Sequence, residues 1–416
     1  MSNKGMIINE CAQLNVARRV LEGRVDSATF FRKIHGDLLI TGNEAGNQEM
    51  LLDLFRCSME KSDMPTILLT SHLELMTKIQ KKRDLKEMSC VMTSCPTDKN
   101  YHPFYGMTVQ QILRFVRMTA EEMGYGILTD QVMIYAAAVL NVVAAKYPVS
   151  LPAVAKLLKE DDDFISEFAL QSGLSNVIAD NIRANHEAGI VLRRLLERLE
   201  EIFEHIYMPD CDTKYNFQSG AKGNVTGMAM YVCASNQCIF NSYLKEEIFC
   251  TLKRVPRVRI ILDEMTFTDE NDELLKYLME TKRQNKIELI LMSQNINEMM
   301  HGREGLDFSN IVMFIHGTPA ATDDISGALF GSYQYYFPAP VAGNTPHVIF
   351  SIKHSVQWQL QSEERHRIRS NDLYAKQTIF GYSSDYLVVK TTANANVYLI
   401  RVADFLPAST GVPLVV

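Results

Sequence analysis

The sequence predicts an α/β fold: a mainly parallel sheet flanked by helices, with an inserted all-helical domain and a β-rich C-terminal edge. Between Thr108 and about His205, apolar residues recur only with the 3.6-residue period of amphipathic helices. On both sides of this stretch, short apolar runs alternate with helical segments, which is typical of parallel βαβ units. Two strand-type runs, at 385–391 and 396–402, end the chain. These three observations together give the predicted architecture.

The same changes of pattern divide the chain into four predicted segments. A length of 416 residues allows two or three domains. Segments 1–105 and 208–335 are expected to form the two parts of the sheet domain, with a short strand at 29–34 and an irregular stretch at 90–105 in the first part. Segment 106–207 is the all-helical insert, and segment 336–416 is the β-rich C-terminal part.

Composition and charge are those of an ordinary globular protein. The chain is 47% hydrophobic and 22% charged, and its net charge of -7 gives no overall basic field that would indicate nucleic acid. No apolar run reaches the roughly 18 residues of a membrane-spanning helix, and the N-terminus lacks the apolar core of a signal peptide. Cysteines are scattered, which suits a reducing compartment. The sequence therefore predicts a cytoplasmic protein without a transmembrane segment.

Two apolar runs that end in polar residues form the first candidate site. The run VRIIL ends in Asp263 and Glu264, and the run at 287–292 ends in Ser293 and Gln294. An amphipathic helix at 272–283 separates the runs, so the three elements form a right-handed βαβ unit. Ligands of open α/β sheets bind at the carboxyl ends of the strands, where these side chains could hold Mg²⁺ and a nucleophilic water. In the alternative interpretation, Asp263 and Gln294 only cap the helices that follow them.

The loop after residue 41 is the second candidate site. It has the place and length of a phosphate-binding loop, with Gly42 and Gly46 inside it. Asn47, Gln48 and Glu49 stand where such a loop has its third glycine, its lysine and its Ser or Thr. A lysine brings positive charge to the phosphates and the hydroxyl binds Mg²⁺, whereas Glu49 brings negative charge toward a polyanion. A plain βα turn, which uses Gly and Asn for tight geometry, explains the loop equally well.

The order of these motifs resembles RecA-type P-loop ATPases of the HerA/FtsK branch. Within that branch, the chain is most similar to the ATPase domain of conjugative coupling proteins and related type IV secretion ATPases, which carry an all-helical domain inserted after the second strand. The resemblance covers roughly residues 35–335. It rests on ILDE at 261–264 and SQN at 293–295, while GNEAGN at 42–47 agrees in position only.

The resemblance implies a role for each matching residue. Asp263 falls on the Walker B aspartate, which orients Mg²⁺, and Glu264 falls on the glutamate that polarises the attacking water. Gln294 falls on the sensor of the γ-phosphate. Arg283 lies near the position at which this family has basic residues that act across subunits. ATP and Mg²⁺ are the cofactors that these matches imply if the protein is active, with Asp263 as the metal-binding residue; an inactive protein would need none.

The phosphate-binding loop departs from the family. Gln48 and Glu49 replace the Walker A lysine and its Ser or Thr. Phosphoryl transfer depends on neutralising the phosphate charge, so this replacement is expected to cost several kcal/mol of transition-state stabilisation. The sequence therefore favours a pseudo-ATPase, related to conjugation or type IV secretion, in which nucleotide hydrolysis is weak or absent.

Two alternatives stay open. The first is an active ATP-dependent translocation motor that takes its lysine from elsewhere, for example Lys78 or Lys222. The second is a non-motor module that binds DNA or protein through the helical insert. The resemblance implies a homo-oligomeric ring or partner ATPase subunits, a DNA or secreted-protein substrate, and association with a membrane secretion complex.

Overall fold

The computed structural model of the chain contains two compact units. One unit comprises residues 1–46 and 292–416, and the other comprises residues 47–291. The structure describes residues 6, 10, 21–42, 45–61, 64–126, 129–208, 215–222, 225–233, 237–265, 273–294, 308–314, 330, 332–342, 356–366, 386–391 and 394–406.

The sheet of the unit at 47–291 has the strand order β4-β5-β3-β6-β7. Its strands are β3 (Thr66–Thr70), β4 (Val91–Ser94), β5 (Gly227–Tyr231), β6 (Val258–Asp263) and β7 (Ile287–Ser293), of which residues 287–291 belong to this unit. Pairing is parallel from β4 to β5, from β5 to β3 and from β3 to β6. Every residue of β3 and β6 is buried, which explains why these runs are almost continuously apolar. Thr70 lies opposite Asp263 in the register, so the ends of two adjacent strands meet.

The charged pair of Arg259 and Glu288 is buried inside this unit. The Nη2 atom of Arg259 is 2.9 Å from Oε2 of Glu288, and the two side chains are only 4% and 10% exposed. The Nη1 atom of Arg259 donates to the backbone carbonyl of Ser58 at 2.5 Å. The guanidinium is thereby paired on both sides, which a buried charge requires.

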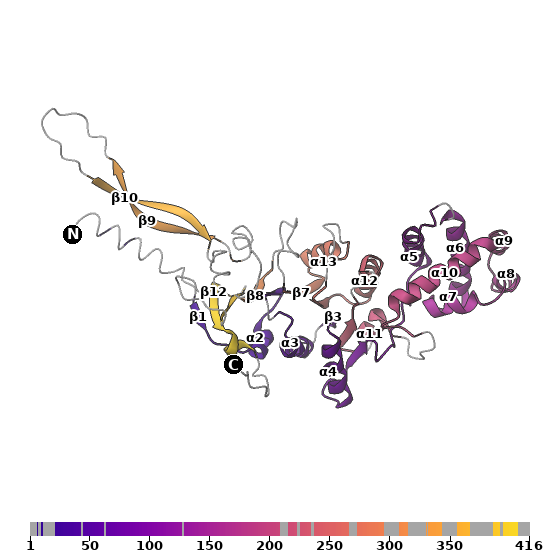
Figure 1. The fold of residues 1–416 in the computed structure, drawn as a ribbon, viewed down its shortest axis with the longest axis horizontal. Coiled ribbons are helices and arrows are strands. Elements are labelled where there is room, and N and C mark those ends of the chain that lie inside the picture. The colour runs from indigo at the N-terminus through magenta and orange to yellow at the C-terminus, as the bar shows by residue number, and fades with distance from the viewer. Residues whose placement is uncertain are drawn as a thin grey trace. The chain divides into compact units, whose positions relative to one another are not determined.

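Five helices in the described part of this unit lie outside the insert. They are α3 (Gln48–Glu60), α4 (Leu73–Asp84), α11 (Phe217–Lys222), α12 (Gln237–Leu252) and α13 (Glu273–Arg283). Helix α13 buries Leu274, Leu275 and Leu278 and lies beside α12 (Figure 1). Helix α4 follows β3 directly, so residues at its N-terminus stand close to the end of that strand.

The all-helical insert lies between β4 and β5 in the sequence. It contains α5 (Val109–Glu122), α6 (Thr129–Lys146), α7 (Leu151–Leu157), α8 (Asp162–Gln171), α9 (Asn176–Ala184) and α10 (His186–Phe203). Thr108 and Gln111 form a capping box that begins α5, and Pro152 stands in the first turn of α7. These helices gather into one cluster (Figure 1).

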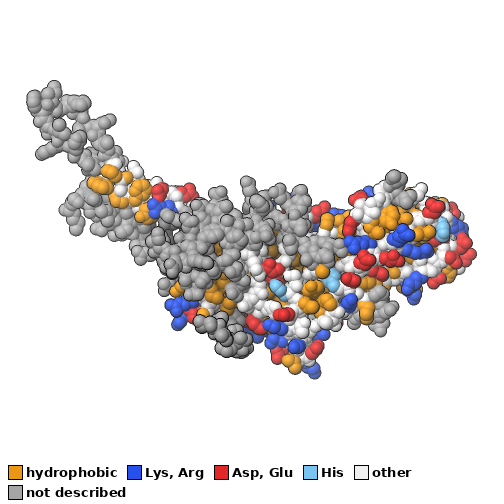
Figure 2. Space-filling model, in the orientation of Figure 1, with side chains coloured by type: hydrophobic (Ala, Val, Ile, Leu, Met, Phe, Trp, Pro, Cys, Tyr) orange, Lys and Arg blue, Asp and Glu red, His pale blue; other side chains and the backbone are white. Residues whose placement is uncertain are grey.

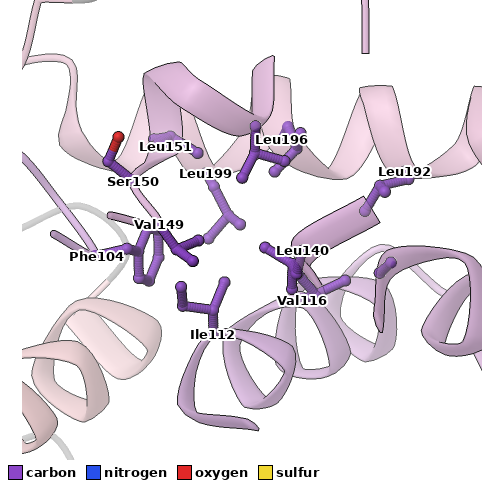
Figure 3. A pocket seen from close by; sticks show the side chains of 12 residues that line it. Phe104, Ile112, Val116, Leu140, Val149, Ser150, Leu151, Leu192, Leu196 and Leu199 are labelled. Carbon is purple, nitrogen blue, oxygen red and sulfur yellow. The ribbon is translucent and has the colours of Figure 1, made fainter. Parts of the chain in front are cut away.

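Leucines on one face of α10 close the core of the insert. Leu192, Leu196 and Leu199 approach α5, α6 and α7 around a cavity of about 10 Å³ (Figure 3). The cavity is lined almost entirely by apolar side chains and is only about large enough for one water, so it should stay dry. The 3.6-residue pattern in the sequence therefore marks a packed core.

A buried polar cluster lies at the base of the insert. Tyr101, before α5, and Tyr215, after α10, pair through a β-bridge, so the two connections to the insert run together. Tyr101 and Tyr243 share a hydrogen bond of 2.8 Å between their hydroxyls. Glu247 of α12 is fully buried, and its Oε1 atom accepts the backbone N–H of Phe217 at 3.0 Å.

The other unit contains a mixed sheet and a hairpin. The sheet order is β1-β12-β11-β8-β2, formed by β1 (Leu21–Gly23), β2 (Leu38–Thr41), β8 (Asn310–Phe314), β11 (Tyr386–Thr391) and β12 (Asn394–Arg401). Pairs β1–β12 and β2–β8 are parallel, whereas β11 is antiparallel to both of its neighbours. Strands β9 (Ser332–Ala342) and β10 (Val356–His366) form a separate antiparallel pair. Among the described residues, this unit also contains helices α2 (Ser27–Lys33) and α17 (Val402–Phe405).

The predicted fold class is confirmed, and two local expectations were wrong. A strand was expected at 29–34, but α2 occupies this position because Asp26 caps it and Phe30 and Phe31 pack against Phe405. The region 90–105 was expected to be irregular, but it contains the edge strand β4. The four predicted segments remain a prediction.

No single helix within the described ranges is long and apolar enough to cross a membrane. The pair Asp130–Lys146 and Leu151–Leu157 meets the length and composition criteria only when taken together, and it is bent by 109°.

Candidate functional site

The loop after β2 begins with a close backbone approach. Gly42 has a φ of +106°, and a Cβ atom at this position would lie 2.5 Å from the carbonyl oxygen of Phe314. The N–H of Gly42 donates to the carbonyl of Ser293 at 3.3 Å, and its own carbonyl accepts the N–H of Ala45 at 2.9 Å. Only glycine suits this position, because any side chain would meet backbone atoms of β8.

Asn47 begins helix α3 as its N-cap. Its Oδ1 atom accepts the N–H of Met50 at 3.0 Å. This is the ordinary capping role of asparagine, and it accounts for the residue without a phosphate. Gly46 precedes it, half-buried, while residues 43 and 44 lie outside the described part of the chain.

Helix α4 binds Gln48 and Glu49, the two residues predicted to replace the Walker A lysine and hydroxyl. Gln48 Nε2 donates to Oε2 of Glu74 at 2.9 Å. Lys78 Nζ lies 2.5 Å from Oε1 of Glu49, and these two side chains are 39% and 53% exposed. Glu74 and Lys78 are one turn apart on α4, so the first turn of α3 is held at two successive points. A lysine therefore does stand next to the loop, but it is paired with a carboxylate.

Asp263, at the end of β6, lies in a buried polar cluster. Its side chain is fully buried, and Oδ2 accepts a hydrogen bond of 2.5 Å from the hydroxyl of Thr70. The Thr70 hydroxyl in turn accepts the backbone N–H of His72 at 3.0 Å. Burial raises the pKa of Asp263 to about 7, and the Thr70 hydrogen bond opposes this rise. Within the described residues, Oδ1 of Asp263 has no hydrogen-bond partner, which is compatible with a cation ligand.

Glu264 has an unusual backbone. Its φ is +51°, in the left-handed region that residues other than glycine rarely adopt. Such a conformation costs about 1–2 kcal/mol and is common at ligand-binding turns. The chain therefore leaves the extended conformation at Glu264, directly after Asp263 ends β6.

The remaining predicted residues lie at element ends. Arg283 is exposed at the C-terminus of α13. Gln294 follows β7 and is exposed. Gly42, Gly46 and Gln294 belong to one unit, whereas Asn47, Gln48, Glu49, Asp263, Glu264 and Arg283 belong to the other. Their assembly into a single site stays a prediction.

Sequence reasoning missed Thr70 and His72. Both follow the apolar run at 67–69 in the peptide TSH, so a buried strand that ends in polar residues was the available signal. What the sequence did not reveal was that β3 pairs with β6 and brings Thr70 to Asp263. Lys78 was named, with Lys222, as a candidate substitute lysine in one alternative, but its pairing with Glu49 was not foreseen. The side chain of Lys222 lies outside the described residues.

Comparisons with known proteins identify the fold. No protein-family model and no curated protein matches the chain. The unbound bacterial conjugative coupling protein TrwBΔN70 is 14% identical with a TM-score of 0.52, over 94% of this chain and 90% of that one. TrwB in complex with ADP and Mg²⁺ is 11% identical with a TM-score of 0.51, over 94% and 91%. TrwB with the ATP analogue ADPNP is 13% identical with a TM-score of 0.50, over the same shares. The chain therefore has the fold expected from its resemblance to coupling-protein ATPases.

Proposed function

We propose that this protein is a component of a conjugation-related or type IV secretion-related apparatus that uses a RecA-like ATPase fold with weak or absent hydrolysis of its own. The observation that carries the proposal is the ion pair between Glu49 and Lys78. At the position where an active loop offers a hydroxyl to Mg²⁺, this chain has a carboxylate, and the nearby cation is bound to it.

The chemistry of phosphoryl transfer supports this conclusion. Catalysis of this reaction consists mostly of positioning and of neutralising the charge that develops on the phosphate oxygens. Gln48 is uncharged and its amide is already hydrogen-bonded to Glu74. Glu49 together with Lys78 contributes no net positive charge. The N-terminus of α3 is therefore a weak phosphate site.

Asp263 and Glu264, the predicted Walker B residues, are better suited to bind a cation than the loop at 42–49 is to bind phosphate. Asp263 has an unpartnered buried oxygen atom among the described residues, and Glu264 follows it in a strained conformation. TrwB has been solved with ADP and Mg²⁺. We infer that Asp263 would hold Mg²⁺ and Glu264 would orient water if ATP were bound, while Gln294 and Arg283 keep their predicted roles as sensor and trans-acting cation.

A second candidate is an active motor in which Lys78 serves as the missing lysine. Its pair with Glu49 favours this candidate as well, because it places a primary amine beside the loop. Exposed pairs of this kind contribute at most about 1 kcal/mol, so a bound phosphate could displace Glu49 from the amine. The two candidates make opposite predictions for the removal of Lys78.

ATP hydrolysis by matched variants distinguishes the candidates. The pseudo-ATPase predicts background hydrolysis in the native protein and in Lys78→Ala, and increased nucleotide affinity in Gln48→Lys/Glu49→Thr. The motor predicts measurable hydrolysis that Lys78→Ala abolishes. Lys82→Ala is the control, since Lys82 lies one turn further along α4 and pairs with Glu87 at 3.0 Å. Hydrolysis that depends on both Lys78 and Asp263 would refute the pseudo-ATPase.

The proposed partners are copies of this chain or related ATPase subunits, and a DNA or protein substrate. On the visible face of the insert, acidic and basic side chains are interleaved (Figure 2). Binding of DNA should therefore be weak and should fall steeply with salt. Native mass spectrometry tests for a ring, and gel shifts at two salt concentrations test for DNA. A cytoplasmic location, at a membrane secretion complex, remains part of the proposal.

A further inference from the structure

The ends of β3 and β6 bring an imidazole to the buried carboxylate of Asp263. His72 Nε2 lies 3.7 Å from Oδ2 of Asp263. This separation is too long for a hydrogen bond. Nε2 of His72 and Oδ1 of Asp263 are both buried, and neither has a hydrogen-bond partner among the described residues. The imidazole and the carboxylate are thus neighbours, and each has a buried atom that the other does not satisfy.

A buried polar atom without a partner is costly, so such a pair indicates a ligand. The carboxylate of Asp263 is fully buried, whereas the His72 side chain is 29% exposed, which leaves a route from solvent. A proton shared directly between the two groups would need a shorter contact than 3.7 Å. A cation coordinated by Nε2 and Oδ2 gives Nε2 a partner at the observed separation, and a water bound to the same cation can donate to Oδ1.

The geometry suits a small divalent cation. An ion about 2.1 Å from both Nε2 and Oδ2 would subtend an angle of about 120° at their 3.7 Å separation, which a tetrahedral or five-coordinate site accepts. Thr70 supports this arrangement, because its hydroxyl donates to Oδ2 and is itself oriented by the N–H of His72. Hydrogen bonds of this type fix a carboxylate ligand in place. No group of three or more His, Cys, Asp or Glu side chains able to hold a metal occurs in the described ranges, so water would complete the coordination.

The nature of the ligands determines which ion binds. Mg²⁺ prefers oxygen ligands, whereas imidazole favours first-row transition ions such as Mn²⁺, Co²⁺ and Zn²⁺. We propose that His72 and Asp263 form a two-residue site for a divalent transition-metal ion, which binds there in preference to Mg²⁺. This proposal goes beyond the proposed function, because the site needs no nucleotide and no residue of the loop at 42–49.

Metal binding in the absence of nucleotide tests the proposal. Pulsed EPR of the native protein with Mn²⁺ should show coupling to a histidine nitrogen, and Co²⁺ should give a visible absorption that saturates at one ion per chain. His72→Ala should remove the nitrogen coupling and weaken Co²⁺ binding at least about tenfold. The affinity of His72→Ala for Mg²⁺ should stay unchanged.

The control is a second histidine beside a carboxylate. His186 pairs with Asp162 on the surface of the insert, where its side chain is 69% exposed. His186→Ala should leave Co²⁺ binding unchanged, so loss in this variant would place the ion elsewhere. Native protein that shows no nitrogen coupling at saturating Mn²⁺, or that binds Mg²⁺ as tightly as Co²⁺, would overturn the proposal. Neither outcome depends on whether ATP binds.

Discussion

Replacing Glu247 with glutamine should raise the free energy of unfolding, relative to that of the native chain, more at pH 8 than at pH 5. Glu247 is fully buried beneath the insert, where Phe217 and Gln218 donate to it. Burial raises the pKa of its carboxyl from an ordinary 4.5 to about 7, and the hydrogen bonds from Gln218 and Phe217 oppose this rise. Glutamine keeps an oxygen that accepts the Phe217 N–H, but it carries no charge.

The size of the effect follows from the two pKa values. A rise from 4.5 to about 7 corresponds to about 3 kcal/mol, at about 1.36 kcal/mol for each pH unit. The folded state binds the Glu247 proton more tightly than the unfolded state does. Its contribution to stability is therefore complete below pH 4.5 and is lost as the pH rises through about 7.

Urea unfolding of both proteins, followed by circular dichroism at pH 5 and pH 8, measures this difference. Groups that titrate equally in both proteins cancel in the comparison. The free energy of unfolding of Glu247→Gln, relative to native, should increase by about 3 kcal/mol between the two pH values. Glu280→Gln, at an exposed position of α13, should show no such increase. A difference for Glu247→Gln that is independent of pH would refute the reasoning.

Two further predictions concern backbone and buried charge. Gly42→Ala should destabilise the protein by about 2 kcal/mol or more, because its Cβ would meet the Phe314 carbonyl, and thermal unfolding should show a lower midpoint. Arg259→Met should cost about 3–5 kcal/mol, because Glu288 stays buried without its partner. The double variant Arg259→Met/Glu288→Leu should recover much of that loss in the same measurement, whereas an equal or larger loss would contradict the pairing.

The sequence predicted those elements whose pattern is local. The buried run at 258–262 and the helical periodicity of the insert match β6 and α5–α10. A strand buried on both faces is almost continuously apolar, and a helix buried on one face is apolar at every third or fourth residue, so both can be recognised in the sequence. The expected strands at 385–391 and 396–402 match β11 and β12 closely. Helix α2 was missed because its start depends on a single cap, Asp26, and on distant contacts with Phe405.

The residues of the candidate site could be predicted only where they lie in one continuous segment of the sequence. Asp263 and Glu264 follow a recognisable strand, so their place at its end could be read from the sequence. Thr70 and His72 became relevant only through the pairing of β3 with β6, across almost two hundred residues, and the insert lies between them. The same holds for Glu49 and Lys78, because a sequence does not show which helices approach each other.

Calorimetric titration of the native protein with ATP and Mg²⁺ tests the central claim most directly. The pseudo-ATPase predicts no binding heat at millimolar nucleotide, and measurable binding when Gln48→Lys/Glu49→Thr introduces a lysine and a hydroxyl. Micromolar binding to the native chain that is abolished by Asp263→Ala would contradict it.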